Sequence, residues 1–239
     1  MDIAVCALMY GKYHQLHRRF ISKLLPSLPA GTKLHLGANE LGPTSISLLS
    51  SAFGIPPSEF KGTGWENEKV RLYTQNNTNR RKYPVMREMF DRVPDTSHTL
   101  WLDDDTMLSG STKWWDMLRA YFDSGVDYTG VEYFMRYTGK QLSFIKSRDW
   151  YRGKPPVLRG NKPVFVFYTG SFWGLSARAR AVLDWPDREI GHNGGDTLLG
   201  EAVRQNNLNR KAFPCQRHGI RINSEKRRGL DEAPAGSGG

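Results

Sequence analysis

The sequence predicts an α/β protein, built as one domain around a central, mostly parallel sheet with helices on both faces. Three observations lead to this prediction. Apolar runs of strand length alternate with segments of helical periodicity from the N-terminus onward. The 239 residues suit one α/β domain of ordinary size. Hydrophobic residues make up 38% and charged residues 24%, which is the balance of a globular chain.

The first part of the chain alternates strands and helices. Strands are expected at residues 3–9, 33–36 and 70–73, and helices before Pro26, at 43–53 and around 85–90. The unbroken apolar character of the first strand is typical of a strand that is buried on both faces of a parallel sheet. The strand–helix–strand–helix order predicts parallel pairing through right-handed crossovers.

The second part of the chain is less regular. A fourth strand ends at Leu102, directly before three acids. Beyond it we expect helices at 113–122, 177–183 and 197–205 and strands at 128–131, 164–168 (turning and continuing through 169–175) and 211–213. Residues 133–163 show no clean periodicity, which predicts a long irregular loop. We therefore expect one domain over residues 1–228 and a disordered tail over residues 229–239.

Composition narrows the class of protein. No apolar run approaches the ~20 residues of a membrane span, and the N-terminus lacks the basic-then-apolar order of a signal peptide. The two cysteines, Cys6 and Cys215, support neither a disulfide framework nor a cysteine zinc site. A cytoplasmic protein without a transmembrane segment is expected. The net charge of +10 favours polyanions such as nucleic acid, an anionic membrane or phosphorylated small molecules, although surplus charge also serves solubility.

The most informative stretch is the strand that leads into Asp103, Asp104 and Asp105. Side chains that follow parallel strands gather at the carboxyl edge of the sheet, where ligands of open α/β sheets bind. Three adjacent carboxylates repel one another. A divalent cation such as Mg²⁺ or Mn²⁺, which prefers oxygen ligands, makes their arrangement favourable. The sequence therefore predicts a metal site here, with a solvated acidic turn as the alternative.

Three further segments are candidates for binding. Residues 74–82 are polar and basic, which suits a nucleotide's base or phosphate, or a plain solvated loop. Residues 133–163 hold eight basic residues, six aromatic residues and one acid. That mixture contacts phosphates and stacks on bases, unless the aromatics merely pin a solvated excursion to the core. Gly170 and Gly174 flank the pair Phe172–Trp173, which indicates close approach of the backbone to a ligand, or an ordinary bulge.

In this order the features resemble the GT-A-fold glycosyltransferases, in particular the inverting family 2-like group. The N-terminal strand–helix pairs resemble the nucleotide-binding half of that Rossmann-like fold, and residues 76–90 resemble its Asn- and basic-rich helix. Leu102-Asp103-Asp104-Asp105 resembles its Asp-any-Asp motif, with Asp103 and Asp105 as the outer acids. Gly194-Gly195-Asp196 stands at a helix start, where the family places its catalytic base, commonly as an acidic pair. Asp196 also suits a helix N-cap. The resemblance covers about Ile3 to His218.

The resemblance implies a metal-dependent hexosyltransferase that uses a nucleotide sugar, with a UDP-sugar favoured. Asp105 would bind Mn²⁺ or Mg²⁺ directly, with Asp103 and His218 as further metal ligands. Asp103 and Asp104 would also hold the ribose and a metal-bound water. A plain surface histidine is the alternative for His218. The residues assigned to the nucleotide or the sugar are Tyr10, Asn79, Arg80, Arg81 and Trp173, and Arg217 or Arg221 would pair with the diphosphate.

The catalytic step is also implied by the resemblance. Asp196 would accept the proton of the acceptor hydroxyl as that oxygen attacks the anomeric carbon, which inverts the anomeric centre in one displacement. His192 is a rival base. Ser171, Phe172 and Trp173 would form an aromatic surface for the sugar or the acceptor.

The acceptor is inferred from charge. The basic, aromatic loop at 133–163 and the basic C-terminal segment favour a polyanion, and we expect hydroxymethylated pyrimidine in DNA, flipped from the stack as in phage-type DNA glycosyltransferases. Such a phage protein would act in the host cytoplasm. A saccharide or lipid-linked acceptor is the alternative within the class.

Three other classes of protein fit the sequence less well. A phosphatase of the haloacid dehalogenase type would have Thr or Val where Met107 stands, and a nucleotidyltransferase would have a Gly-rich N-terminal phosphate loop. A non-catalytic nucleic-acid-binding protein would explain the charge but not the acidic strand.

Overall fold

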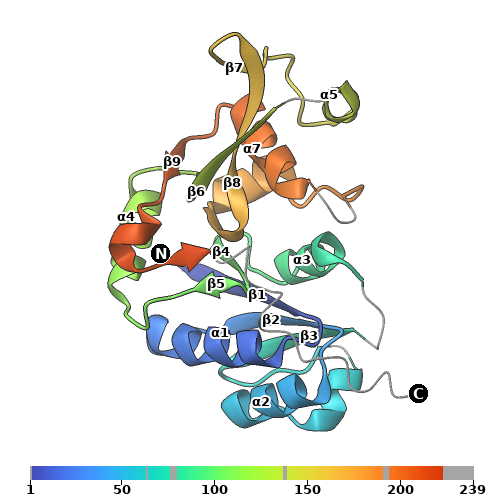
Figure 1. The fold of residues 1–239 in the computed structure, drawn as a ribbon, viewed down its shortest axis with the longest axis vertical. Coiled ribbons are helices and arrows are strands. Elements are labelled where there is room, and N and C mark those ends of the chain that lie inside the picture. Colours follow the sequence, from blue (N-terminus) through green and yellow to red (C-terminus); the bar gives the residue numbers. More distant parts are fainter. Residues whose placement is uncertain (1, 63, 76–79, 137–138, 191–193, 223–239) are drawn as a thin grey trace, which may run out of the picture.

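The structure, a computed structural model, describes residues 2–222 except 63, 76–79, 137–138 and 191–193 (Figure 1). Its main sheet contains eight strands in the order β3-β2-β1-β4-β8-β6-β9, with β7 paired to the outer part of β8. The strands are β1 (Ile3–Tyr10), β2 (Leu34–Asn39), β3 (Val70–Gln75), β4 (His98–Asp103), β6 (Tyr128–Arg136), β7 (Val157–Arg159), β8 (Lys162–Leu175) and β9 (Arg210–Ala212). A separate pair joins β5 (Thr106–Met107) to β10 (Arg221–Ile222).

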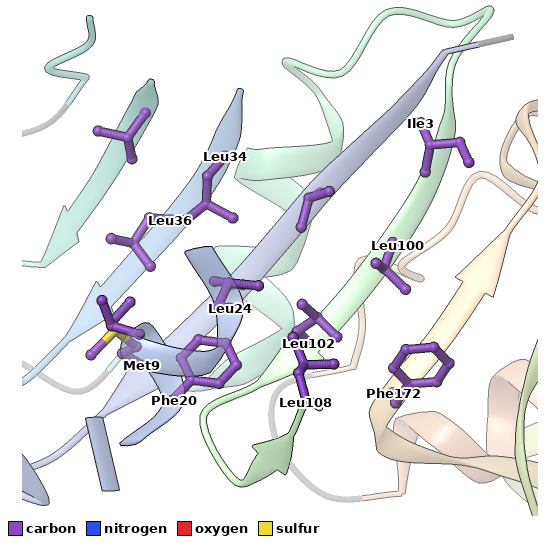
Figure 2. Packing of buried hydrophobic residues seen from close by; sticks show 14 of the residues in the cluster. Ile3, Met9, Phe20, Leu24, Leu34, Leu36, Leu100, Leu102, Leu108 and Phe172 are labelled. Carbon is purple, nitrogen blue, oxygen red and sulfur yellow. The ribbon is translucent and has the colours of Figure 1, made fainter. Parts of the chain in front are cut away.

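Helices cover both faces of this sheet, as the alternating pattern predicts. They are α1 (His14–Ser27), α2 (Pro43–Phe53), α3 (Lys82–Phe90), α4 (Lys113–Asp123), α5 (Gly139–Lys146), α6 (Ala177–Leu183) and α7 (Gly195–Gln205), with short 3-10 turns η1 (Pro57–Lys61) and η2 (Cys215–His218). One core lies between the sheet and α1, α2 and α4, and Figure 2 shows its leucines with Phe20 and Phe172. The second core lies between the sheet and α3, α6 and α7. The predicted α/β class is confirmed.

The first four long strands are parallel, which brings their carboxyl ends to one edge. β1 pairs with β2 on one side and with β4 on the other, and Leu8 lies opposite Asp103. The chain leaves β1 at Tyr10 and β4 at Asp103, so the acidic triplet stands beside the end of β1. The predicted position of the acids at the carboxyl edge is confirmed.

The other half of the sheet is built on one long strand. β8, with 14 residues, runs antiparallel to both β4 and β6. Its pairing with β6 shifts register, because Gly130 pairs with Trp173 but Glu132 pairs with Tyr168, so residues 169–172 of β8 lie opposite the single residue Val131. The irregularity expected at 169–175 is therefore present as a bulge within one continuous strand. β9 returns parallel to β6.

Residues 133–163 do not form an irregular loop. β6 continues to Arg136, α5 follows, and β7 forms a hairpin with the start of β8. The sequence pattern failed here because Tyr133 and Phe134 are consecutive and both are exposed, so the strand lacks the alternation that a half-buried strand shows. The tail at 229–239 lies outside the described residues.

Candidate active site

The side chains of the three acids at the end of β4 lie in three different environments. Asp103 is the last residue of β4, Asp104 and Asp105 form the following turn, and β5 begins at Thr106. Asp104 is 1% exposed and Asp105 is 7% exposed. The turn is held on its far side because the Thr106 hydroxyl donates a hydrogen bond to the Ser171 carbonyl of β8. A solvated acidic turn is therefore excluded.

Asp104 is bound to the protein interior. Its Oδ2 accepts a hydrogen bond from the Tyr10 N–H at 2.9 Å and lies 3.2 Å from Nε2 of the fully buried His17. The other ring nitrogen of His17 lies 2.7 Å from the Ser45 hydroxyl of α2. The expectation that Asp104 holds a ribose is wrong in this geometry, because its carboxylate is buried and engaged by β1 and α1. Asp104 anchors the turn instead.

Asp103 is paired with a lysine that the sequence did not single out. Lys82 begins α3, and its Nζ lies 2.7 Å from Asp103 Oδ2 and donates a second hydrogen bond to the Gly170 carbonyl at 2.9 Å. The Trp101 indole N–H donates to the other oxygen, Oδ1, at 2.8 Å. Both partners of the ion pair are about one-sixth exposed, at 16% for Lys82 and 17% for Asp103.

The environment of this ion pair raises the pKa of both partners. Burial raises the pKa of Asp103 to about 7, against the lowering effect of Lys82 and with a further raising effect of Asp105. Burial by itself would lower the pKa of Lys82, but Asp103 and then Asp196 outweigh it and raise that pKa. The ammonium therefore stays charged while the carboxyl beside it titrates near neutrality.

Asp196 reaches the same place from helix α7, which lies on the same face of the sheet as α3. It lies in the first turn of α7, where its Oδ1 accepts a hydrogen bond from the Tyr83 hydroxyl at 2.9 Å and lies 3.9 Å from Lys82 Nζ. Burial, reinforced by Asp196, holds the pKa of Tyr83 well above its usual value. The alternative role of Asp196 as the helix N-cap is wrong, because that position is Gly194, at a φ of 86°.

Two glycines make room for this cluster. A Cβ at Gly170 would lie 2.4 Å from Asp196 Oδ2 and 2.6 Å from Lys82 Nζ, and a Cβ at Gly195 would lie 2.0 Å from the Tyr83 ring. Such distances are far below contact between unbonded atoms. The prediction that Gly170 marks a close approach of the backbone agrees with this packing, and the approaching groups are charged side chains.

Asp105 is the acid of this site with a carboxylate oxygen that is available to a ligand. Its Oδ1 is buried and has no hydrogen-bond partner in the part of the chain that the structure describes. A buried carboxylate oxygen without a donor is costly, and a cation relieves that cost. Among the described residues no three His, Cys, Asp or Glu side chains form a metal-binding group. Within the described residues the site offers one or two carboxylates, which is how Mg²⁺ is bound when substrate phosphates complete the coordination.

The remaining candidates differ in where they lie. Pairing of Ile222 with Thr106 brings the C-terminal segment beside the acidic turn. His218 precedes that pair and packs its ring against Phe213 at 5.6 Å, and no described contact joins it to Asp105. Arg221 lies in the pairing strand β10, opposite Met107, and Arg217 lies in η2.

Tyr10 ends β1 and is half-buried next to Asp104. Arg80 forms an ion pair with Glu88 of α3 at 3.0 Å, and Arg81 precedes α3 with a φ of 68°. Asn79 and His192 lie outside the described residues. The nucleotide-side residues that are described thus border the site without entering the Lys82 cluster.

The aromatic surface expected at residues 171–173 is absent. Trp173 is 1% exposed, stacks on Trp101 at 6.0 Å and belongs to the core, and Phe172 is fully buried in the opposite core. Ser171 is 6% exposed. Because β8 is a central strand covered on both faces, its side chains here pack inward and present no face to a sugar.

The site residues that sequence reasoning missed are His17, Lys82 and Tyr83. A histidine on the apolar face of a helix and a tyrosine within one carry no distinctive sequence signal. Lys82 was included only as the last residue of the polar stretch 74–82. Its position directly before the apolar helix was the available sign, because that residue must lie close to the end of the neighbouring strand.

Solved structures of other proteins resemble this fold. No protein-family model and no curated protein matches the sequence. Among solved structures, the mannosyltransferase PcManGT from Pyrobaculum calidifontis, in complex with GDP-Man and Mn²⁺, aligns with a TM-score of 0.56 at 8% identity over 90% of this chain and 55% of its own. TarS of S. aureus aligns with a TM-score of 0.51 at 11% identity over 85% and 33%. The chain has a GT-A-like fold. Mouse xyloside xylosyltransferase 1 aligns with a TM-score of 0.46 at 12% identity over 90% and 86%.

None of the helices in the described part of the chain is both long and apolar enough to cross a bilayer.

Proposed function

We propose that this GT-A-like protein is a glycosyltransferase that moves a sugar from a nucleotide-sugar donor to an acceptor hydroxyl. The observation that carries the proposal is the convergence of Asp103, Asp105, Asp196 and Lys82 at the carboxyl edge of the parallel half-sheet. Ligands of such sheets bind at that edge. The fold similarity to a mannosyltransferase crystallised with GDP-Man and Mn²⁺ supports the same class of donor.

The metal ion is assigned to Asp105 first and Asp103 second. Asp105 offers an unpartnered oxygen, whereas both oxygens of Asp103 already accept hydrogen bonds. A bound Mn²⁺ or Mg²⁺ would neutralise charge on the diphosphate leaving group. Engagement of Asp103 requires Lys82 to release its Oδ2. His218 is not assigned to the metal, because it forms no group of three ligands with Asp103 and Asp105 in the described part of the chain and its ring packs against Phe213.

The donor is proposed to lie along the end of β1. Tyr10 lies there, next to the anchored Asp104, and is proposed to flank the nucleotide base. Arg80 and Arg81 directly precede Lys82, the first residue of α3, and are proposed to meet the phosphates together with Asn79. We propose a UDP-sugar as donor.

Asp196 is proposed as the base of an inverting displacement. One of its oxygens is held by Tyr83, and the other lies over Gly170, where a side chain would block it. Held in this way, the carboxylate can accept the acceptor's hydroxyl proton at Oδ2 without a rotamer search. Replacement Asp196→Asn should leave donor binding intact and abolish transfer, and the anomeric configuration of the product, read by NMR, tests inversion.

The acceptor proposed is a hydroxymethylated pyrimidine in DNA, on the strength of the net charge of +10 and the basic character of residues 133–163. A saccharide or lipid-linked acceptor is the competing choice. Transfer of radiolabelled sugar to hydroxymethylated DNA, but not to unmodified DNA, would support the first. Transfer only to a saccharide or lipid-linked acceptor would replace it.

The experiment that tests the function is thermal melting with Mn²⁺ and a panel of nucleotide sugars. A donor at 100 times its Kd stabilises the native state by about 2.7 kcal/mol, which raises the Tm of a chain of this length by roughly 5–10 °C. Asp105→Asn should lose the shift. Asp116→Asn, an exposed acid of α4, is the matched control and should keep it. If no donor shifts the Tm, or if Asp105→Asn responds like the parent, the proposal fails.

A further inference from the structure

The outer part of the sheet forms a three-stranded ribbon at one end of the molecule, the end that carries the label β7 at the top of Figure 1. The first residues of β8 lie in its middle. β6 pairs with them on one side, with Phe134 opposite Val166 and Arg136 opposite Val164. β7 pairs on the other side, with Arg159 opposite Lys162.

Cross-strand partners share a face of a sheet, and so do alternate residues along a strand. Phe134, Arg136, Arg159 and Lys162 therefore all lie on one face of this ribbon, which we call the ribbon face. All four are exposed, Phe134 by 43%. Helix α7 packs against the inner part of the opposite face, where a Cβ at Gly200 would lie 2.6 Å from the Phe167 Cβ.

Two cations of the ribbon face repel each other. Arg159 and Lys162 are direct cross-strand partners, an arrangement of like charges that destabilises a hairpin. The Arg159 guanidinium also lies 4.2 Å from the centre of the Phe134 ring. Among the described residues, no ion pair joins Arg136, Arg159 or Lys162 to an acid. Glu132 lies at the inner end of the same face, opposite Tyr168. A bound anion would relieve the repulsion at the outer end.

We propose that the ribbon face binds a nucleic-acid strand, with its three cations on successive phosphates and the free side of the Phe134 ring stacked on a base. Charge complementarity and the arginine–aromatic pair are the features that single-strand-binding surfaces use. A membrane surface fits less well, because insertion needs apolar side chains and cations on one side. Here Phe134 is the one large exposed apolar side chain among the described residues of the ribbon that shares the face of the cations, whereas the exposed Tyr133 and Leu158 pair with Phe167 and Pro163 on the opposite face.

The ribbon face is connected to the candidate active site by one strand. β8 runs from Lys162 to Gly170, whose carbonyl binds Lys82. The role of a bound nucleic acid as acceptor rests on the proposed function, whereas its binding does not need a donor, so the two are tested separately.

The test is fluorescence anisotropy of a short labelled single-stranded DNA, without metal or nucleotide sugar, across a range of salt concentrations. The variant Arg136→Gln/Arg159→Gln/Lys162→Gln should bind at least about tenfold more weakly, and its salt slope should fall by about 2, at ~0.7 per lost phosphate contact. Phe134→Leu should weaken binding while leaving the salt slope unchanged. Lys162→Gln alone should raise the Tm, since it removes one of two opposed charges and leaves the contact between Arg159 and Phe134 in place.

A matched control separates location from net charge. Arg18→Gln/Lys23→Gln/Arg119→Gln removes the same charge from exposed positions of α1 and α4 and should change the affinity by less than about twofold. Equal losses in the two triple variants would overturn the proposal, as would absence of DNA binding in the parent. Binding of the parent to phosphatidylglycerol vesicles but not to DNA, lost only in the ribbon-face variant, would replace nucleic acid by a membrane. Loss of DNA binding with an intact donor-induced Tm shift would leave the proposed function standing.

Discussion

Removal of the Lys82 ammonium is the sharpest test of the cluster at the carboxyl edge. Lys82→Met keeps most of the side-chain volume but leaves Asp103 beside Asp105 and Asp196 without their shared cation. Removal of one partner of a fully buried ion pair lowers the free energy of unfolding by about 3–5 kcal/mol. Because Lys82 and Asp103 are each about one-sixth exposed, water screens part of this, and we expect a loss of about 2–3 kcal/mol in the free energy of unfolding.

The assay is urea denaturation at pH 7 in EDTA, followed by circular dichroism, with four proteins in a double-mutant cycle. Lys82→Met, Asp103→Asn and the double variant are compared with the parent. The double variant should be more stable than the sum of the two single losses predicts, by about 1–2 kcal/mol, because it no longer holds a buried Asp103 carboxyl that has lost its partner and must take up a proton at this pH. Lys23→Met, at an exposed position of α1, should change stability by no more than about 0.5 kcal/mol.

Two results would contradict this reasoning. If Lys82→Met were as stable as its exposed control, the ammonium would not be neutralising the acids. If the losses in the cycle were simply additive, Lys82 and Asp103 would not interact. The same variants measured with Mn²⁺ then show how the metal competes: stabilisation by Mn²⁺ should be larger in Lys82→Met than in the parent, because no ammonium has to leave Asp103 Oδ2.

Three further predictions concern other parts of the fold. Burial lowers the pKa of His35 from 6.5 to about 4, so between these pH values the unfolded chain binds a proton that the folded chain does not. The free energy of unfolding should therefore fall by about 3 kcal/mol as the pH drops through this window. In urea titrations at a series of pH values, His35→Gln should flatten this fall. Gly195→Ala should displace the Tyr83 ring and cost about 1–3 kcal/mol with loss of activity, whereas Gly62→Ala, which has its nearest neighbour at 3.9 Å, should be neutral by thermal melting and activity assay. His17→Ala should weaken Mn²⁺ binding, measured by electron paramagnetic resonance, because the acidic turn loses its anchor; unchanged affinity would show that the turn holds itself.

Local pattern was sufficient for the parallel half of the fold. The apolar run of β1, the helices before Pro26 and after Pro43, and the acid-tipped β4 all follow from short-range periodicity, because each element buries a face that its own sequence marks. The carboxyl-edge position of the acids follows from the parallel order alone.

The antiparallel half was harder to predict for physical reasons. β8 is covered on both faces for much of its length and crosses two glycines, so it shows neither the alternation nor the continuity of a simple strand. The ribbon at 133–163 is exposed on both sides of β6, which removes the periodic signal altogether. Burial of Trp173 likewise depends on the strands on either side of it, which lie far away in the sequence.

The sequence by itself determined the fold class, the place of the acidic triplet and the surplus of positive charge, because these depend on composition and on neighbours along the chain. Only the tertiary structure decided what each acid does. It turned Asp104 inward to His17, left an oxygen of Asp105 free, and joined Asp103 and Asp196 through Lys82. Those partners come from separate helices and strands, and the direction of a carboxylate is set by whichever donors the packed fold brings within hydrogen-bond distance.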